Sequence, residues 1–111
     1  MLFRSLRFSS PRVVLGIPVQ YRFGNTIAAA LALNLSHGGI AIRTTSPLEQ
    51  SAKIKVRFRI PGSKRDIDAE GRVAWADPRV GMGVQFEKVD AASQVLIDNF
   101  VDAHFFSNRK A

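Results

Sequence analysis

Residues 34–39, Asn-Leu-Ser-His-Gly-Gly, combine groups that can hold a ligand with a backbone that can come close to one. The amide of Asn34 donates and accepts hydrogen bonds, and so does the hydroxyl of Ser36. Gly38 and Gly39 can take positive φ and bring bare amides against a ligand. Many Asn/Ser/Gly hairpin turns share the spacing N-x-S-x-x-G. By itself this spacing predicts a tight turn, which is compatible with a binding loop but does not indicate one.

An isolated arginine, Arg12, precedes this segment by 22 residues. A guanidinium can bind a phosphate through two parallel hydrogen bonds and can also stack on a flat base. Its fork matches the O6 and N7 atoms of guanine as well. The alternative is a solvated arginine at the start of an edge strand. Together with the 34–39 segment, the residue types favour ligand binding.

The remaining polar residues form no recognisable catalytic or metal-binding set. His37 adjoins Ser36, but neighbours in sequence point different ways and no orienting acid is apparent. The acids form no pair suited to general acid–base catalysis, and two histidines without cysteine offer little to a metal. We predict that His104 packs on a helix face. The sequence therefore predicts a binding domain and no enzyme.

The setting of these residues resembles the PilZ domain, a family of small bacterial receptors for cyclic di-GMP. The family pairs an arginine motif, R-x-x-x-R, with a downstream D/N-x-S-x-x-G motif, which Asn34, Ser36 and Gly39 fill. Pro-Arg-Val at 11–13 is similar to the start of the family's first strand, which makes Arg12 the second arginine. The resemblance continues through G-R-V-A-W at 71–75 and G-M-G-V-Q-F at 81–86, and it extends from residue 8 to residue 101.

The first motif departs from the family pattern. Phe8 stands four residues before Arg12, at the place of the first arginine, and the nearest arginines are Arg7 and Arg4. Arg7 reaches the same place only if the chain bulges by one residue. The ring of Phe8 could stack on a guanine, or it could fill a site that has lost its ligand. Both readings of position 8 stay open.

The resemblance implies an all-β fold, a six-stranded antiparallel barrel capped by a C-terminal helix. It implies a flexible basic arm at residues 1–7, the barrel and helix at 8–106, and a loose tail at 107–111. The implied ligand is cyclic di-GMP, with no metal or other cofactor. Its implied binding residues are Arg12, Arg7, Asn34, Ser36, Gly38 and Gly39.

The resemblance also implies a cytoplasmic adaptor that passes second-messenger binding to a protein effector. In this family such effectors belong to motility, chemotaxis, secretion or biofilm systems. An alternative is a degenerate PilZ domain that binds no nucleotide and acts through protein contact alone. Phe8 in the arginine motif favours that alternative.

Composition supports an anion-binding, water-soluble domain of 111 residues. Net charge is +7, and residues 1–48 contain five arginines and no acid, a field that attracts anions. The absence of cysteine excludes disulfides and thiolate metal sites. The longest apolar run, residues 27–33, is far shorter than the roughly 20 residues of a membrane helix, so no membrane insertion is expected.

Residues 53–60 alternate cations with apolar residues and predict a half-buried strand. Its partner is residues 67–75, and a pairing of Ile60 with Ile67 would set Arg59 opposite Asp68. Because the partner strand carries acids, and Phe58 points away from the cations, the pattern does not favour binding of single-stranded nucleic acid. We expect nucleic acid not to be a partner.

The other elements can be assigned from their periodicity. Residues 26–35 predict a strand with Ile27, Leu31 and Leu35 on one face and alanines on a tightly packed outer face. Trp75 shares parity with Val73, which favours packing in the core or at the barrel end over a ring near the ligand. Asp90 is a candidate N-cap for a helix whose apolar residues recur at three- and four-residue spacing. Adjacent phenylalanines at 105–106 predict one exposed ring, suited to a partner or dimer surface.

Overall fold

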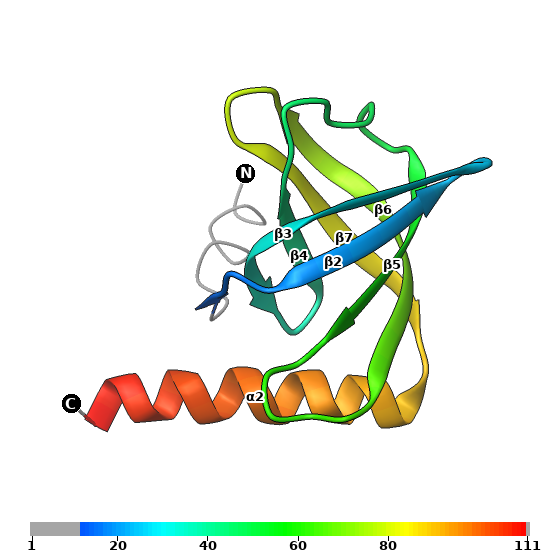
Figure 1. Ribbon diagram of the computed structural model, residues 1–111. Coiled ribbons are helices and arrows are strands. Elements are labelled where there is room, and N and C mark those ends of the chain that lie inside the picture. The colour runs from blue at the N-terminus through cyan, green and yellow to red at the C-terminus, as the bar shows by residue number, and fades with distance from the viewer. Residues whose placement is uncertain (1–11, 111) are drawn as a thin grey trace.

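The computed structural model describes residues 12–110 of the chain, with side chains for residues 12–104 (Figure 1). The predicted arm at 1–7, including Arg7, and the aromatic residue Phe8 lie outside the described residues. Within them the chain forms seven strands and one helix. These are β1 (Val13–Val14), β2 (Pro18–Phe23), β3 (Thr26–Ser36), β4 (Gly39–Arg43), β5 (Lys53–Arg59), β6 (Asp66–Asp77), β7 (Gly81–Val89) and α2 (Ala91–Lys110).

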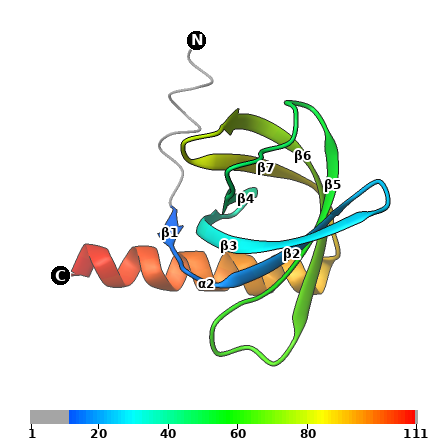
Figure 2. The ribbon, with the colours of Figure 1, turned by 45° about the horizontal axis from the view of Figure 1, so that its top comes forward.

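Six of the strands form a closed antiparallel barrel. They pair in the order β3–β2–β5–β6–β7–β4, and β4 returns to pair with β3. Figure 2 shows the ring, with the short β1 lying beside the C-terminal part of β3. Helix α2 crosses one end of the barrel (Figure 1). The predicted fold, a six-stranded antiparallel barrel with a C-terminal helix, is confirmed.

The barrel interior is the hydrophobic core. On β5, Ile54, Val56 and Phe58 are buried while the alternating cations are exposed, as the period of two predicts. The helix closes the core with Ile97 and Val101, which are fully buried. Its N-terminus is capped as expected, since the backbone N–H of Ser93 donates to Asp90 Oδ2 at 3.3 Å. Burial of this helix face fixes α2 against the barrel end.

The register of β5 and β6 differs from the prediction. Phe58 pairs with Ile67, so that Arg57 lies opposite Asp68 and Arg59 opposite Asp66. Both arginines donate to these carboxylates, with Nε to Oδ1 distances of 2.7 Å and 2.9 Å. The predicted pairing of Arg59 with Asp68 is wrong because the connecting loop begins earlier, at residue 60. Since the shift is even, the same side chains still face the core.

The inward and outward faces of β3 also differ from the prediction. Ile27 and Leu31 point outward, with 52% and 48% of their surface exposed, whereas Ala32 is buried. A β-bulge lies between Ala32 and Asn34, so the inward parity changes and Leu35 is buried after it. The first half of β3 is lined inside by alanines because large core residues of β2 lie opposite them, Tyr21 across from Ala28 for example.

Candidate functional site

The pairing of β1 with β3 brings the predicted motif residues together. Val13 pairs with Leu35 and Val14 with Asn34. Residues paired across antiparallel strands share a face, and Val13 and Leu35 are buried, so Val14 and Asn34 face outward. Continued by one residue, this register sets the exposed Arg12 opposite Ser36. Arg12 and the second motif, 22 residues apart in the chain, therefore lie on one outer face of the barrel.

The two glycines of the turn between β3 and β4 do not adopt the backbone conformation considered for them in the sequence analysis. Neither Gly38 nor Gly39 is among the described glycines with positive φ. A Cβ on Gly39 would overlap the carbonyl oxygen of Val84 on β7, whereas a Cβ on Gly38 would meet open space. Ser36 Oγ donates to the Gly39 carbonyl at 3.3 Å and so stabilises the turn. The close approach of β7 therefore requires a glycine at position 39. At position 38 neither backbone strain nor crowding requires one.

Trp75 lies on the outer face, so the prediction that it packs in the core is wrong. A β-bulge at Ala74 separates the pairs Val73–Val84 and Trp75–Gly83, and this extra residue turns the indole outward. Trp75 is 40% exposed. Parity within one strand could not reveal the bulge. The glycine at position 83 of the next strand was the available signal, because it leaves room for a large ring.

Trp75 belongs to the same face as the motif residues. Through successive strand pairs Asn34 lies opposite Ala41, Ala41 opposite Gly83, and Gly83 opposite Trp75. A continuous row therefore runs from Val14, which is 85% exposed, across β3, β4 and β7 to the indole on β6. A guanidinium, an amide, a hydroxyl and an aromatic ring on one surface can bind a phosphate and stack on a planar base.

His37, in the turn of the second motif, contacts two acids of the helix. Its Nδ1 lies 2.8 Å from Asp98 Oδ1, and its Nε2 lies 3.0 Å from Asp102 Oδ1. Sequence reasoning found no orienting acid, because both carboxylates lie more than 60 residues further along the chain. Since both ring nitrogens face carboxylates, the imidazole does not act as a base on Ser36. The arrangement connects the loop to α2.

Comparison with known protein families gives the same assignment. The family model described as "PilZ domain" matches residues 6–103. The chain belongs to the PilZ domain family. A comparison with curated protein sequences gave no match.

Solved structures share the fold of this PilZ domain at low sequence identity. The Bacillus subtilis inhibitor of motility MotI/DgrA has a TM-score of 0.76 at 20% identity, covering 91% of this chain and 52% of that one. The PilZ domain of CeSA from a cellulose-synthesizing bacterium has a TM-score of 0.66 at 18% identity, and the match covers 85% of this chain and 97% of that one. The PilZ domain of Escherichia coli YcgR, with c-di-GMP, has a TM-score of 0.67 at 12% identity, and the match covers 92% of this chain and 94% of that one. This chain thus spans about half the length of MotI/DgrA.

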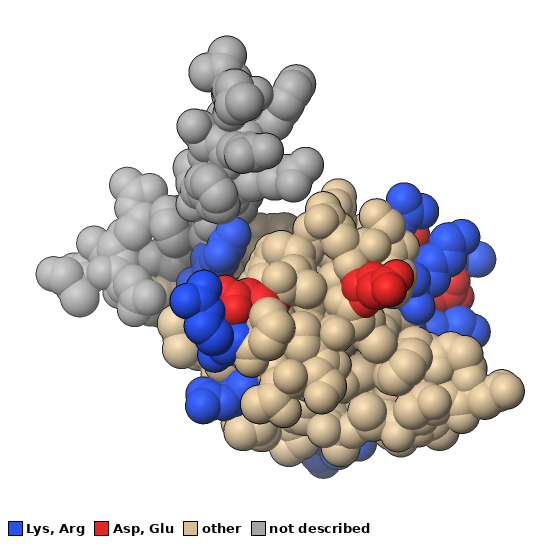
Figure 3. Space-filling model, turned by 90° about the horizontal axis from the view of Figure 1, so that it is seen from above, with Lys and Arg blue, Asp and Glu red and all other residues tan. Residues whose placement is uncertain are grey.

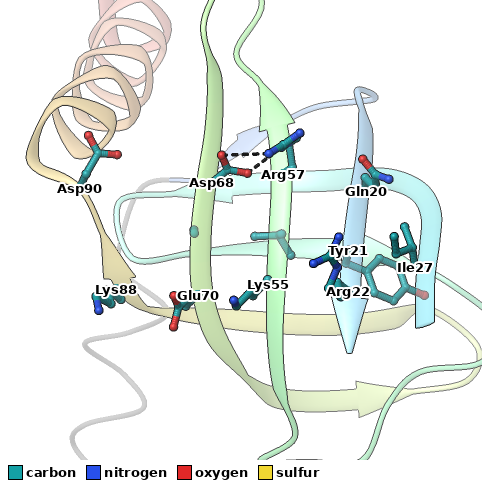
Figure 4. Close-up of a pocket in the computed structure, with 12 residues that line it drawn as sticks. Gln20, Tyr21, Arg22, Ile27, Lys55, Arg57, Asp68, Glu70, Lys88 and Asp90 are labelled. Carbon is teal, nitrogen blue, oxygen red and sulfur yellow. Dashed lines mark hydrogen bonds and ion pairs between the residues drawn. The ribbon is translucent and has the colours of Figure 1, made fainter. Parts of the chain in front are cut away.

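A hollow lies on another part of this PilZ domain, across the outer faces of β2, β5 and β6 (Figure 4). Arg22, Lys55, Glu70 and Lys88 succeed one another in strand register there. Arg57 is paired with Asp68, as the dashed lines show. The partner strand thus partly neutralises the cationic strand, as predicted. None of the motif residues lines this hollow.

The positive charge of this PilZ domain is distributed over more than one region. Seen from the end opposite α2, lysines and arginines gather at separate edges with uncharged surface between them (Figure 3). Phe58 is buried while Lys55 and Arg57 are exposed, so the cationic strand does not alternate with exposed aromatic rings. Among residues 12–110, no helix is long and apolar enough to cross a membrane. No group of three metal-ligating side chains occurs in that same part of the chain.

Proposed function

We propose that this PilZ domain is a receptor for cyclic di-GMP, bound on the outer face that carries Arg12, Asn34, Ser36 and Trp75. The observation that supports it most directly is the β1–β3 register, which sets Arg12 opposite Ser36 and beside Asn34. Two solved relatives, the YcgR domain and Borreliella burgdorferi PlzA, are described as complexes with c-di-GMP. PilZ domains are receptor and adaptor domains rather than enzymes.

Each side chain has a distinct role in this proposal. The guanidinium of Arg12 binds a phosphate, and it stacks on a guanine or donates two hydrogen bonds to the guanine edge. Asn34 and Ser36 read the guanine edge through hydrogen bonds. The indole of Trp75 offers a stacking surface at the far end of the row. Arg7, which lies outside the described residues, would add a second cation from the N-terminal arm, and Gly38 and Gly39 would let the nucleotide approach the turn.

The proposed output is contact with a protein effector in the cytoplasm, controlled by the nucleotide. One solved relative is named an inhibitor of motility, which supports an effector in a motility system over one in chemotaxis, secretion or biofilm formation. The second candidate function is a PilZ domain that binds no nucleotide and acts through protein contact alone. The departure at Phe8 from the arginine motif favours it.

Calorimetric titration of cyclic di-GMP into wild-type protein and Arg12→Ala tests the receptor function. Loss of a charged hydrogen-bonding group costs roughly 1.5–3 kcal/mol, so we expect affinity to fall by about tenfold or more. Arg59→Ala is the matched control, because this arginine pairs with Asp66 on the β5–β6 face. Absence of heat from a folded wild-type protein would favour the protein-contact function instead.

A further inference from the structure

His37 is the point at which the turn of the second motif contacts helix α2. Its ring lies between Asp98 and Asp102, and the side-chain amide of Gln94 donates to the His37 carbonyl at 2.9 Å. The same amide donates to Asp98 Oδ1 at 2.8 Å. The three helix residues are spaced by four, so they occupy one face of α2. The turn is therefore held by three polar side chains from successive turns of the helix.

Each ring nitrogen of His37 lies within hydrogen-bond distance of a different carboxylate of the helix. Asp98 and Asp102 are like charges four residues apart on a helix, an arrangement that is unfavourable by itself. The ring of His37 lies between the two carboxylates and joins the turn to both, a contact that neither the turn nor the helix has alone.

The contact lies next to the proposed nucleotide face. Ser36, which the continued register sets opposite Arg12, directly precedes His37. Without His37, Asp98 would keep its contact with Gln94, and Asp102 would lose the contact that it makes with the turn. Among the described residues, the polar side-chain contacts between the 36–39 turn and α2 are those of His37 and Gln94. Ile97 and Val101 belong to the hydrophobic core of the barrel and hold the helix to it.

We propose that His37 is a positioning residue that couples the nucleotide loop to the docking of α2. Docked α2 holds the 34–39 loop in its binding geometry through His37, and by linkage nucleotide binding stabilises the docked helix to the same extent. The second half of this inference rests on the proposed nucleotide function. The first half, the mechanical connection between turn and helix, does not.

The connection is tested first without nucleotide, by amide hydrogen exchange of residues 34–39 and 98–102. In His37→Gln one of the two carboxylates loses its donor, and we expect exchange there to become faster by on the order of tenfold. His37→Arg should restore slow exchange, because a guanidinium can donate to both carboxylates. His104→Gln is the control and should leave the rates unchanged, because this exposed residue of the same helix makes its hydrogen bond to the Phe100 carbonyl one turn away. Equal rates in wild type and His37→Gln would overturn the inference.

The coupling is then tested with cyclic di-GMP in a double-mutant cycle. His37→Gln should weaken binding several-fold in the wild-type background but not in Asp98→Asn/Asp102→Asn, where the carboxylates that His37 contacts are absent. An equal loss in both backgrounds would overturn the coupling, because His37 would then contact the nucleotide directly. If wild-type protein binds no nucleotide, the proposed function fails, and the exchange measurement alone decides whether His37 holds the turn to the helix.

Discussion

The indole of Trp75 on β6 lies over the backbone of Gly83 on β7, its partner in the sheet. A Cβ on Gly83 would overlap the indole atoms Nε1, Cε2 and Cδ1. The glycine therefore creates the space in which the ring rests against the outer face. Because Ala41 and Asn34 continue the same row, the position of the ring in the candidate site depends on a residue two strands away from the motif.

Gly83→Ala should displace Trp75 from the barrel surface. The chain contains a single tryptophan, so we expect the emission maximum to shift to longer wavelength as the ring becomes more exposed. Stacking of a base on an aromatic ring contributes about 1–3 kcal/mol, so affinity for cyclic di-GMP should fall by roughly tenfold. Gly16→Ala, whose Cβ would meet open space, is the control. An unchanged emission spectrum in Gly83→Ala would contradict the assigned position of the ring.

The two glycines of the turn should respond differently to alanine. In Gly39→Ala the new Cβ meets the carbonyl oxygen of Val84, a backbone atom that cannot swing aside, so β4 and β7 must separate. We expect the free energy of unfolding to fall by about 1–3 kcal/mol. Gly38→Ala has open space and should stay within roughly 0.5 kcal/mol of wild type. Urea denaturation of both variants measures this, and equal stabilities would show that β7 does not crowd Gly39.

The sequence predicted the barrel but not the faces of every strand. Strict alternation at 53–59 and the N-x-S-x-x-G turn are local signals, and both were confirmed as structure. The bulges at Leu33 and Ala74 are not local signals, because a bulge depends on the pairing with the neighbouring strand. Each bulge reverses the inward parity between the two parts of its strand, which is why Ile27 and Trp75 were assigned to the wrong face.

The contact of His37 was not predictable for a different reason. Asp98 and Asp102 lie 61 and 65 residues beyond it, and only the docking of α2 across the barrel end brings them to the turn. Helical spacing places these two acids on one face of the helix. It could not indicate which loop that face would meet. His104 was expected to pack on a helix face, and it lies exposed against Phe100, with ring centroids 4.2 Å apart.

The docking of α2 should depend strongly on Ile97. This side chain is fully buried under the helix, and truncation of a buried isoleucine to alanine typically costs about 2–5 kcal/mol. We expect Ile97→Ala to lower the midpoint of urea unfolding and to speed hydrogen exchange throughout α2. Val95→Ala, on the same helix with 54% of its surface exposed, should change stability by less than roughly 0.5 kcal/mol. Equal effects of the two substitutions would contradict the docked position of the helix.

The cap at Asp90 should make stability depend on acid. The side-chain hydroxyl of Ser93, its backbone N–H and the charge of Arg65 hold the pKa of Asp90 below its usual range. A lowered carboxyl pKa contributes stability at pH values above the pKa of the same carboxyl in the unfolded chain. This contribution is lost as the pH falls through the pKa in the folded protein.

Asp90→Asn keeps a capping side chain but loses the charge. We therefore expect wild type to melt at a higher temperature than Asp90→Asn at neutral pH, with the difference disappearing as the pH falls through the lowered pKa of Asp90. Thermal melts between neutral and acid pH measure this, with Glu49→Gln, at an exposed site without an ion pair among the described residues, as the control. A constant difference across the range would mean that Asp90 acts without its charge.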